Sequence, residues 1–142
     1  MTPHDPPATS RPKEETLAGR RIFTHHDGHG LNERLHLFAV DEPDESGASH
    51  AYLVRLDGDA LRAVMSIQFQ RGPRKDPDSV PGCTEAVLLA VLIDRLRGFQ
   101  RGPFACRENA LQLTKIEEAL HWTRARADAR ADAGVLGKLE RH

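Results

Sequence analysis

The sequence predicts an α+β fold in which an N-terminal antiparallel β-meander precedes a C-terminal antiparallel two-helix hairpin that oligomerises. Four short apolar runs in the first half are separated by segments typical of turns, which predicts the meander. The second half carries two helical patterns joined by a short link, which predicts the hairpin. The first of these helices is apolar on every side, which predicts an interface with another copy of the chain.

The chain is expected to divide into a tail over residues 1–18, a β region over residues 19–70 and a helical hairpin over residues 71–142. The tail is rich in Pro, Thr, Ser and charge, so we predict that it is disordered. The start lacks the layout of a signal peptide, and no apolar stretch reaches the roughly 18 residues of a membrane helix. We therefore expect a cytosolic protein without a membrane partner. In that setting its two cysteines, Cys83 and Cys106, are expected to be reduced thiols, buried or half-buried.

The β region is expected to form four strands in chain order. The turn segments between them all combine Asp with Gly, and they lie at residues 27–30, 41–47 and 57–59. The strands themselves are predicted at residues 21–24, 35–40, 51–56 and 61–69.

The two helices have recognisable ends. Thr84 stands where an N-cap belongs, and Glu85 follows in the first turn, where the helix dipole favours an acid. This helix is expected to run to residue 96 or 97 and to stop near Gly98. The second helix is expected to run from about residue 107 to residue 133 and to close at Gly134.

Residues 87–93 of the first helix read Val-Leu-Leu-Ala-Val-Leu-Ile, so apolar side chains surround the helix axis. Each large apolar side chain left in water forfeits about 1.5–3 kcal/mol. One partner helix and one small sheet can hardly cover such a helix, which favours an oligomer whose interface includes it. The alternative is a helix that is fully buried within a monomer.

Charge is divided unevenly between the two halves. Residues 1–70 carry 7 basic and 11 acidic side chains for a net charge of −4, whereas residues 71–142 carry 13 and 10 for +3. The second half is therefore the expected place for an anionic ligand. A net +3 without a continuous basic groove is weak for a long nucleic acid, whose binding neutralises many phosphates, so none is expected as a partner.

The link between the helices carries the residue types that a nucleotide pocket uses. Phe99 and Phe104 can stack on a base, Arg107 can pair with a phosphate, and Asn109 can read a base edge or a ribose hydroxyl. The start of the second helix adds free N–H groups that favour phosphate. The alternative is that both phenylalanines belong to the core and that Arg107 is a solvated neighbour of the cap.

A segment with His25, His26 and His29 raises the alternative of a metal site, because zinc uses such ligands. Adjacent histidines point to opposite faces if they end a strand, and Asp27-Gly28 is an ordinary turn pair. The sequence has no His-Glu-x-x-His motif and no paired cysteine motif. We expect a structural turn here, with neither a metal nor a cofactor.

Several runs in the second half occur in an order and spacing that resembles a known family. The most specific are Gly-Pro-Phe-Ala-Cys-Arg-Glu-Asn-Ala at residues 102–110 and Leu-Thr-Lys-Ile-Glu-Glu-Ala-Leu at residues 113–120. The pattern is similar to the helical hairpin of phage sponge proteins, which block bacterial immune signalling by sequestering its nucleotide messengers. The anti-CBASS branch is essentially this hairpin alone. The Thoeris anti-defence branch adds an N-terminal β region, and the present sequence resembles that branch.

This resemblance implies a protein that binds glycocyclic ADP-ribose or a related cyclic nucleotide without catalysis, in the cytoplasm of the infected bacterial host. It also implies a hexamer built as a trimer of dimers, with a possible second site for cyclic di- or trinucleotides. Residue by residue, it implies that Phe99 and Asn109 hold the ADP-ribose ligand, with Arg74 near it. For the second site it implies Arg107 and Arg126, with Thr84 close by.

Two departures from the family pattern lie near the second site: Glu85-Ala86 after Thr84, and Lys138 after residue 137. Trinucleotide binding is therefore the less expected activity.

A rival function of another class is a metal-dependent phosphodiesterase that degrades the nucleotide through the His-rich segment. The product distinguishes the two, because a sponge returns its ligand intact.

Overall fold

A computed structural model describes residues 19–57 and 62–133 of the 142-residue chain. The predicted tail over residues 1–18, the closing Gly134 and the departure at Lys138 lie outside the described residues. The chain divides into two compact units, Met1–Gln68 and Phe69–His142, which we call the sheet unit and the hairpin unit. Each unit is described by itself.

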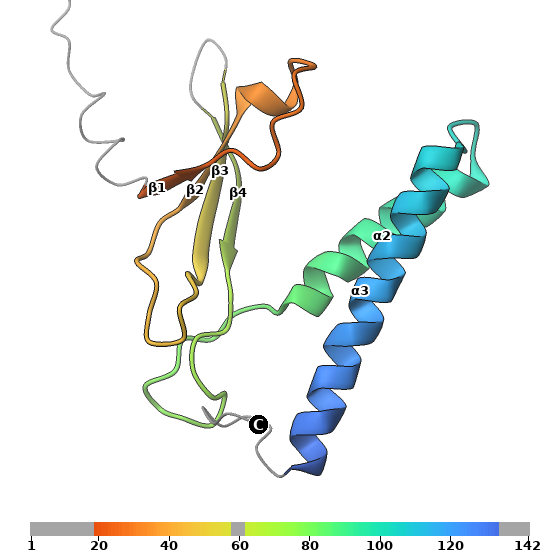
Figure 1. The fold of residues 1–142 in the computed structure, drawn as a ribbon. Coiled ribbons are helices and arrows are strands. Elements are labelled where there is room, and N and C mark those ends of the chain that lie inside the picture. Colours follow the sequence, from red (N-terminus) through yellow and green to blue (C-terminus); the bar gives the residue numbers. More distant parts are fainter. Residues whose placement is uncertain (1–18, 58–61, 134–142) are drawn as a thin grey trace, which may run out of the picture. The chain divides into compact units, whose positions relative to one another are not determined.

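The sheet unit is a four-stranded antiparallel meander (Figure 1). Its strands follow one another in the order β1-β2-β3-β4, so each strand pairs with its neighbour in sequence. Their bounds are β1 Arg20–Ile22, β2 Leu35–Ala39, β3 Ala51–Leu56 and β4 Arg62–Gln68. The α+β fold class predicted from the sequence is confirmed, because this meander is followed by a two-helix hairpin.

Cross-strand pairs of apolar side chains hold the meander in register. Leu37 of β2 pairs with Val54 of β3, and Tyr52 of β3 pairs with Ile67 of β4. Such aromatic and branched side chains suit a pleated, half-buried surface. The register shifts between Val54 and Arg55, where the ladder with β4 is irregular.

The β1–β2 connection is organised around one carboxylate, that of Glu33 in the short 3-10 helix η1 (Asn32–Arg34). It accepts hydrogen bonds from the backbone N–H groups of Asp27 (2.8 Å), Gly28 and Gly30 (2.8 Å). Gly28 and Gly30 have φ values of 80° and 97°, which favour glycine. The N–H of Gly28 and those of the other turn residues hold the pKa of Glu33 at about 2, against the desolvation that raises it.

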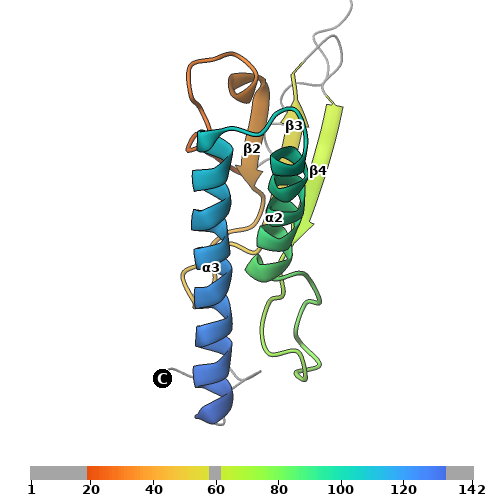
Figure 2. The same ribbon diagram turned by 90° about the vertical axis from the view of Figure 1, so that its right-hand side faces the viewer.

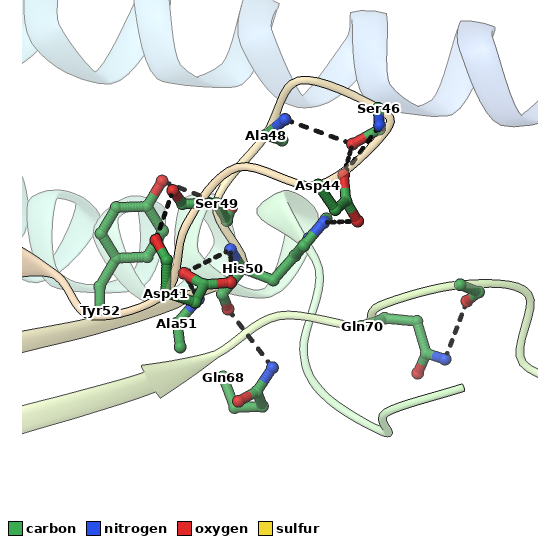
Figure 3. A network of polar contacts seen from close by, with 11 residues as sticks. Asp41, Asp44, Ser46, Ala48, Ser49, His50, Ala51, Tyr52, Gln68 and Gln70 are labelled. Carbon is green, nitrogen blue, oxygen red and sulfur yellow. Dashed lines mark hydrogen bonds and ion pairs between the residues drawn. The ribbon is translucent and has the colours of Figure 1, made fainter. Parts of the chain in front are cut away.

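The β2–β3 connection is held by two further carboxylates (Figure 3). Asp41 accepts from the backbone N–H groups of His50 (2.9 Å) and Ala51 (3.0 Å). Asp44 accepts from the hydroxyl and the N–H of Ser46, and its Oδ2 lies 2.7 Å from His50 Nε2. The bond from the Ser46 hydroxyl is the main reason that the pKa of Asp44 falls to about 2. This loop therefore satisfies its polar groups internally.

The hairpin unit consists of α2 (Glu85–Arg101) and α3 (Arg107–Asp132), which lie side by side and run in opposite directions (Figure 2). The predicted stop of the first helix near Gly98 is wrong, because α2 continues to Arg101 and Gly102 forms its C-cap. Gly102 is extended, and Pro103 follows it. A residue before proline is disfavoured in the helical region, so this pair, rather than the flexible Gly98, ends the helix.

Apolar side chains of α2 are divided between a buried and an exposed set. Ile93 and Leu96 are buried, whereas Val87, Val91 and Leu92 are exposed. Among the described residues of α3 none is buried. The alternative of a first helix fully buried within a single chain is therefore wrong for this structure. Within the described residues, neither helix combines the length and apolarity needed to cross a membrane.

Candidate functional site

The turn between α2 and α3 is where the sequence predicted a ligand site. Gln100, near the end of α2, bonds both backbone groups of Cys106: its Oε1 accepts from the N–H at 3.2 Å, and its Nε2 donates to the carbonyl at 3.3 Å. Gly102 N–H donates to the Phe99 carbonyl, and Ala105 N–H donates to that of Gly102. The turn is thus a closed, hydrogen-bonded loop that joins the two helix ends.

The aromatic side chains of this turn meet at right angles. The rings of Phe99 and Phe104 have centroids 6.4 Å apart and an interplanar angle of 88°. The Arg95 guanidinium lies 4.9 Å from the centre of the Phe99 ring, in cation–π distance. Phe99 is half-buried, whereas Phe104 is 71% exposed. The alternative that both rings belong to the core is therefore wrong for Phe104.

The first turn of α3 brings polar groups to the same place. Asn109 donates through Nδ2 to the Phe104 carbonyl at 3.5 Å, and its backbone N–H donates to Cys106 Sγ at 3.4 Å. Cys106 is therefore the N-cap of α3, and its thiol is exposed, which corrects the prediction of a buried or half-buried side chain. Arg107 follows, with an exposed side chain. A helix that begins in this way offers N–H groups to an anion.

The turn therefore carries three kinds of ligand-binding group. Phe104 and Phe99 present aromatic surface, Arg107 presents a guanidinium, and Asn109 keeps its amide oxygen free of any hydrogen bond within the described residues. A base, a phosphate and a polar edge are the complements of these groups. The arrangement favours an anionic nucleotide.

Comparison with known proteins assigns the hairpin to a family. Residues 61–128 match the model of the Acb2/Tad1 hairpin domain. The hairpin of this chain is similar to the Acb2/Tad1 hairpin domain. Over 78 residues it is 41% identical to Thoeris anti-defense 1 of Bacillus phage SBSphiJ7, a stretch that covers 55% of this chain and 54% of that relative. The chain thus spans about half the length of the curated relative it matches. The resemblance inferred from the sequence is confirmed.

The Acb2/Tad1 hairpin contains all six predicted site residues, but a single chain brings only three of them together. Phe99, Arg107 and Asn109 lie at the turn. Thr84 caps the opposite end of α2, about 22 Å from Phe99 by helix rise, and its hydroxyl makes no capping hydrogen bond. Arg126 lies about 26 Å along α3 from Asn109 by the same measure.

Arg74, the sixth predicted residue, lies in the exposed loop that precedes α2. This loop is closed by paired backbone bonds between Arg71 and Val80, and by Gln70, whose N–H donates to the Cys83 carbonyl at 2.9 Å. Figure 3 shows the Gln70 side chain turned back to the Gly72 carbonyl, a contact of 3.1 Å. The loop is locally ordered around its base, and Arg74 is at its exposed part.

Sequence reasoning missed two residues of the Acb2/Tad1 turn. Arg95 stands four residues before Phe99, the spacing at which helical side chains meet, so the sequence contained a signal for this pair. Gln100 had no such signal, because its partner is the backbone of Cys106. Also missed was a groove of about 340 Å³ between α2 and α3, lined by Ala90, Ile93, Asp94, Arg97, Glu117, Leu120 and Arg124.

Two histidines of the sheet unit, His25 and His36, make hydrogen bonds within that unit. His25 donates from Nε2 to the Leu35 carbonyl at 2.6 Å, and Arg21 donates to His36 Nδ1 at 2.5 Å. Two buried ring nitrogens, His25 Nδ1 and His26 Nε2, have no hydrogen-bond partner among the residues that the structure describes. Over the described ranges, no group of three or more His, Cys, Asp or Glu side chains is arranged to hold a metal ion.

Proposed function

We propose that this protein is a phage anti-defence sponge, which captures a cyclic ADP-ribose-type immune signal, such as glycocyclic ADP-ribose, and so blocks Thoeris immunity. The observation that carries the proposal is the grouping of Phe99, Phe104, Arg107 and Asn109 at the turn of an Acb2/Tad1 hairpin. The name of the Bacillus phage relative supports the same role. The site of action is then the cytoplasm of the infected bacterium.

The proposed binding mode follows from the chemistry of the turn. The base stacks on Phe99, whose ring is already approached by Arg95, and the free amide oxygen of Asn109 accepts from a base edge or a ribose hydroxyl. Arg107 and the opening amides of α3 hold the pyrophosphate. A sponge must outcompete an immune receptor, so nanomolar affinity, about −12 kcal/mol, is the expected scale.

Self-association is part of the proposal. Val87, Val91 and Leu92 leave an apolar face of α2 exposed, and burial of each large side chain is worth about 1.5–3 kcal/mol. A second copy of the chain covers this face in the proposed hexamer, a trimer of dimers, and encloses the ligand between subunits. Arg74, Thr84 and Arg126, which one chain leaves apart from the turn, then belong to sites completed by neighbouring copies.

Binding of cyclic di- or trinucleotides of CBASS is the finer and less favoured part of the proposal. It depends on Arg107 and Arg126 with Thr84 nearby. Arg126 and Thr84 are exposed side chains in this chain. Where the family pattern has Asn-Glu-Ala after Thr84, this chain has Glu85-Ala86, and a carboxylate directly beside Thr84 weakens an anion site.

The test is capture and release. Purified protein is incubated with glycocyclic ADP-ribose, free ligand is removed, and the protein is heat-denatured so that the released material can be identified. Intact ligand in proportion to protein supports the sponge. A cleaved product instead supports a phosphodiesterase acting through the His-rich segment, and retention of no nucleotide contradicts the proposed ligand class.

A further inference from the structure

Resting on the proposed function, we propose that Gln100 is a positioning residue for the ligand site. Its carboxamide holds the backbone of Cys106, and thereby fixes Phe104, Arg107 and Asn109 in the geometry that the ligand requires before the ligand arrives. Gln100 itself need not touch the ligand. Its effect on affinity is then exerted through the shape of the turn.

The geometry of the contact is that of a paired backbone residue. The side-chain amide of Gln100 makes two hydrogen bonds to the backbone of Cys106. Its Oε1 accepts from the Cys106 N–H at 3.2 Å, and its Nε2 donates to the Cys106 carbonyl at 3.3 Å. The Cys106 N–H lies just before α3 and has no other acceptor among the described residues. Removal of Gln100 therefore leaves that donor unpaired, or lets water replace it and the turn move.

Little else fixes the turn. Phe104 is 71% exposed and its ring contact is the edge-on one with Phe99, so packing holds it only weakly. The other bonds of the turn are longer or more local: Asn109 Nδ2 reaches the Phe104 carbonyl at 3.5 Å, and Ala105 N–H reaches the Gly102 carbonyl at 3.3 Å. The Gln100 pair is the contact that ties the end of α2 to the start of α3 across the turn. The binding geometry consequently depends on it.

Loss of this contact should lower the fraction of molecules whose turn is competent to bind. The apparent affinity falls in proportion to that fraction. The helices themselves keep their hydrogen bonds, because Gln100 lies in the last turn of α2 and Cys106 lies outside α3. A variant should therefore fold with unchanged helix content and bind more weakly.

The decisive variants are Gln100→Met and Gln100→Glu. Methionine keeps the length of the glutamine side chain and its lack of charge but forms neither bond. The affinity for glycocyclic ADP-ribose should therefore fall about tenfold at every pH. An ionised glutamate accepts from the Cys106 N–H but cannot donate to the Cys106 carbonyl, whereas a protonated one does both. The affinity of Gln100→Glu should therefore recover as the pH falls from about 7 towards about 4.5, the range in which a glutamate begins to protonate. Gln112→Met, an exposed change on α3, is the matched control.

Wild-type affinity in Gln100→Met overturns the proposal. Recovery of Gln100→Glu at low pH combined with wild-type affinity in Gln100→Met also overturns it, because charge repulsion alone then explains the glutamate. A ligand-free readout separates this proposal from the proposed function. Amide hydrogen exchange at Cys106 should accelerate at least about tenfold in Gln100→Met but not in Gln112→Met. If the wild type retains no nucleotide, the sponge fails while this exchange measurement still decides whether Gln100 holds the turn.

Discussion

The carboxylates of the sheet unit and the ligand-binding groups of the hairpin turn differ in how many hydrogen bonds they make. In the sheet unit, the carboxylates of Glu33, Asp41 and Asp44 each accept several hydrogen bonds from the loops around them. At the hairpin turn, Arg107 is exposed and the amide oxygen of Asn109 accepts no bond within the described residues. Polar groups that satisfy one another stabilise a fold, whereas unsatisfied groups on a rigid support are available to a ligand.

This difference separates two clusters that look equally functional in the sequence. The His-rich segment attracts a metal hypothesis, yet its residues take part in the strand and turn contacts of the sheet unit. The turn at residues 99–109 has a more ordinary composition, but it holds aromatic, cationic and amide groups, and Phe104 and Arg107 are exposed. The same contrast can be tested with paired variants, one in each unit.

The largest expected effect is that of Phe99→Ala. A base stacked on an aromatic ring contributes about 1–3 kcal/mol, and Phe99→Ala also removes the contacts of this ring with Phe104 and Arg95, so capture of glycocyclic ADP-ribose should weaken about 100-fold or become undetectable. Phe23→Ala is the matched control, because Arg21 lies 4.9 Å from the Phe23 ring centre just as Arg95 lies 4.9 Å from that of Phe99. Titration calorimetry measures both. Equal losses in the two variants would mean that the effect is on folding.

A somewhat smaller loss is expected for Asn109→Ala. Leaving a ligand group without its partner costs about 1–3 kcal/mol, or about 5–150-fold in affinity, and water that replaces the amide offsets part of this loss. The proposed oligomer should stay intact, because Asn109 lies at the turn and not on the exposed apolar face of α2. Asn32→Ala, which removes a 2.8 Å bond to Asp27 in the sheet unit, should leave binding unchanged. Dissociation of Asn109→Ala into monomers would count against a ligand role.

The fold was predictable because its signals are local. Alternation and Asp-Gly turns mark the strands, and β3 lies at residues 51–56 as predicted. The first helix was predicted too short because Gly98 was given more weight than the pair Gly102-Pro103, although glycine only permits a helix end while the residue before proline disfavours helix. Of the site, Phe99, Arg107 and Asn109 could be grouped because a short turn joins them. The role of Gln100 could not, since it binds a backbone that any residue supplies.

Val91→Asp tests whether the exposed face of α2 is an interface. Val91 is 59% exposed in the single chain, so a charge there is tolerated by a monomer but opposes burial in an assembly. We expect the native mass, measured by light scattering, to drop, with ligand capture reduced as subunits separate. Val64→Asp on β4 is the matched change in the sheet unit, at 54% exposure. An unchanged mass in Val91→Asp would place the interface elsewhere.

Asp41→Asn should destabilise the sheet unit and leave the hairpin turn alone. Asp41 accepts N–H groups from His50 and Ala51, and an amide in its place can accept less and turns a donor towards them. The expected cost is about 1–3 kcal/mol in the free energy of unfolding. Tyr52 is the single tyrosine and Trp122 the single tryptophan, so their spectra report on the sheet unit and the hairpin unit separately. The Tyr52 signal should change at lower denaturant concentration, with ligand capture retained in native buffer.

Acid should have the smallest effect of all on the stability of the sheet unit, and this effect should appear only at low pH. Glu33 and Asp44 have pKa values of about 2 when folded, compared with ordinary values of 4.5 and 3.8. A lowered pKa means that the unfolded chain binds more protons, so stability is fully present above the ordinary values and is lost as the pH falls from them towards about 2. Between about pH 7 and pH 5 the Tyr52 signal should therefore hold steady. Glu33→Gln should change the pH at which the Tyr52 signal shows its acid transition, because an amide at this position does not titrate and so no longer couples the β1–β2 connection to pH. A Tyr52 transition near neutral pH would contradict this prediction, because the carboxylates of Glu33 and Asp44 would then not be what holds the sheet unit together.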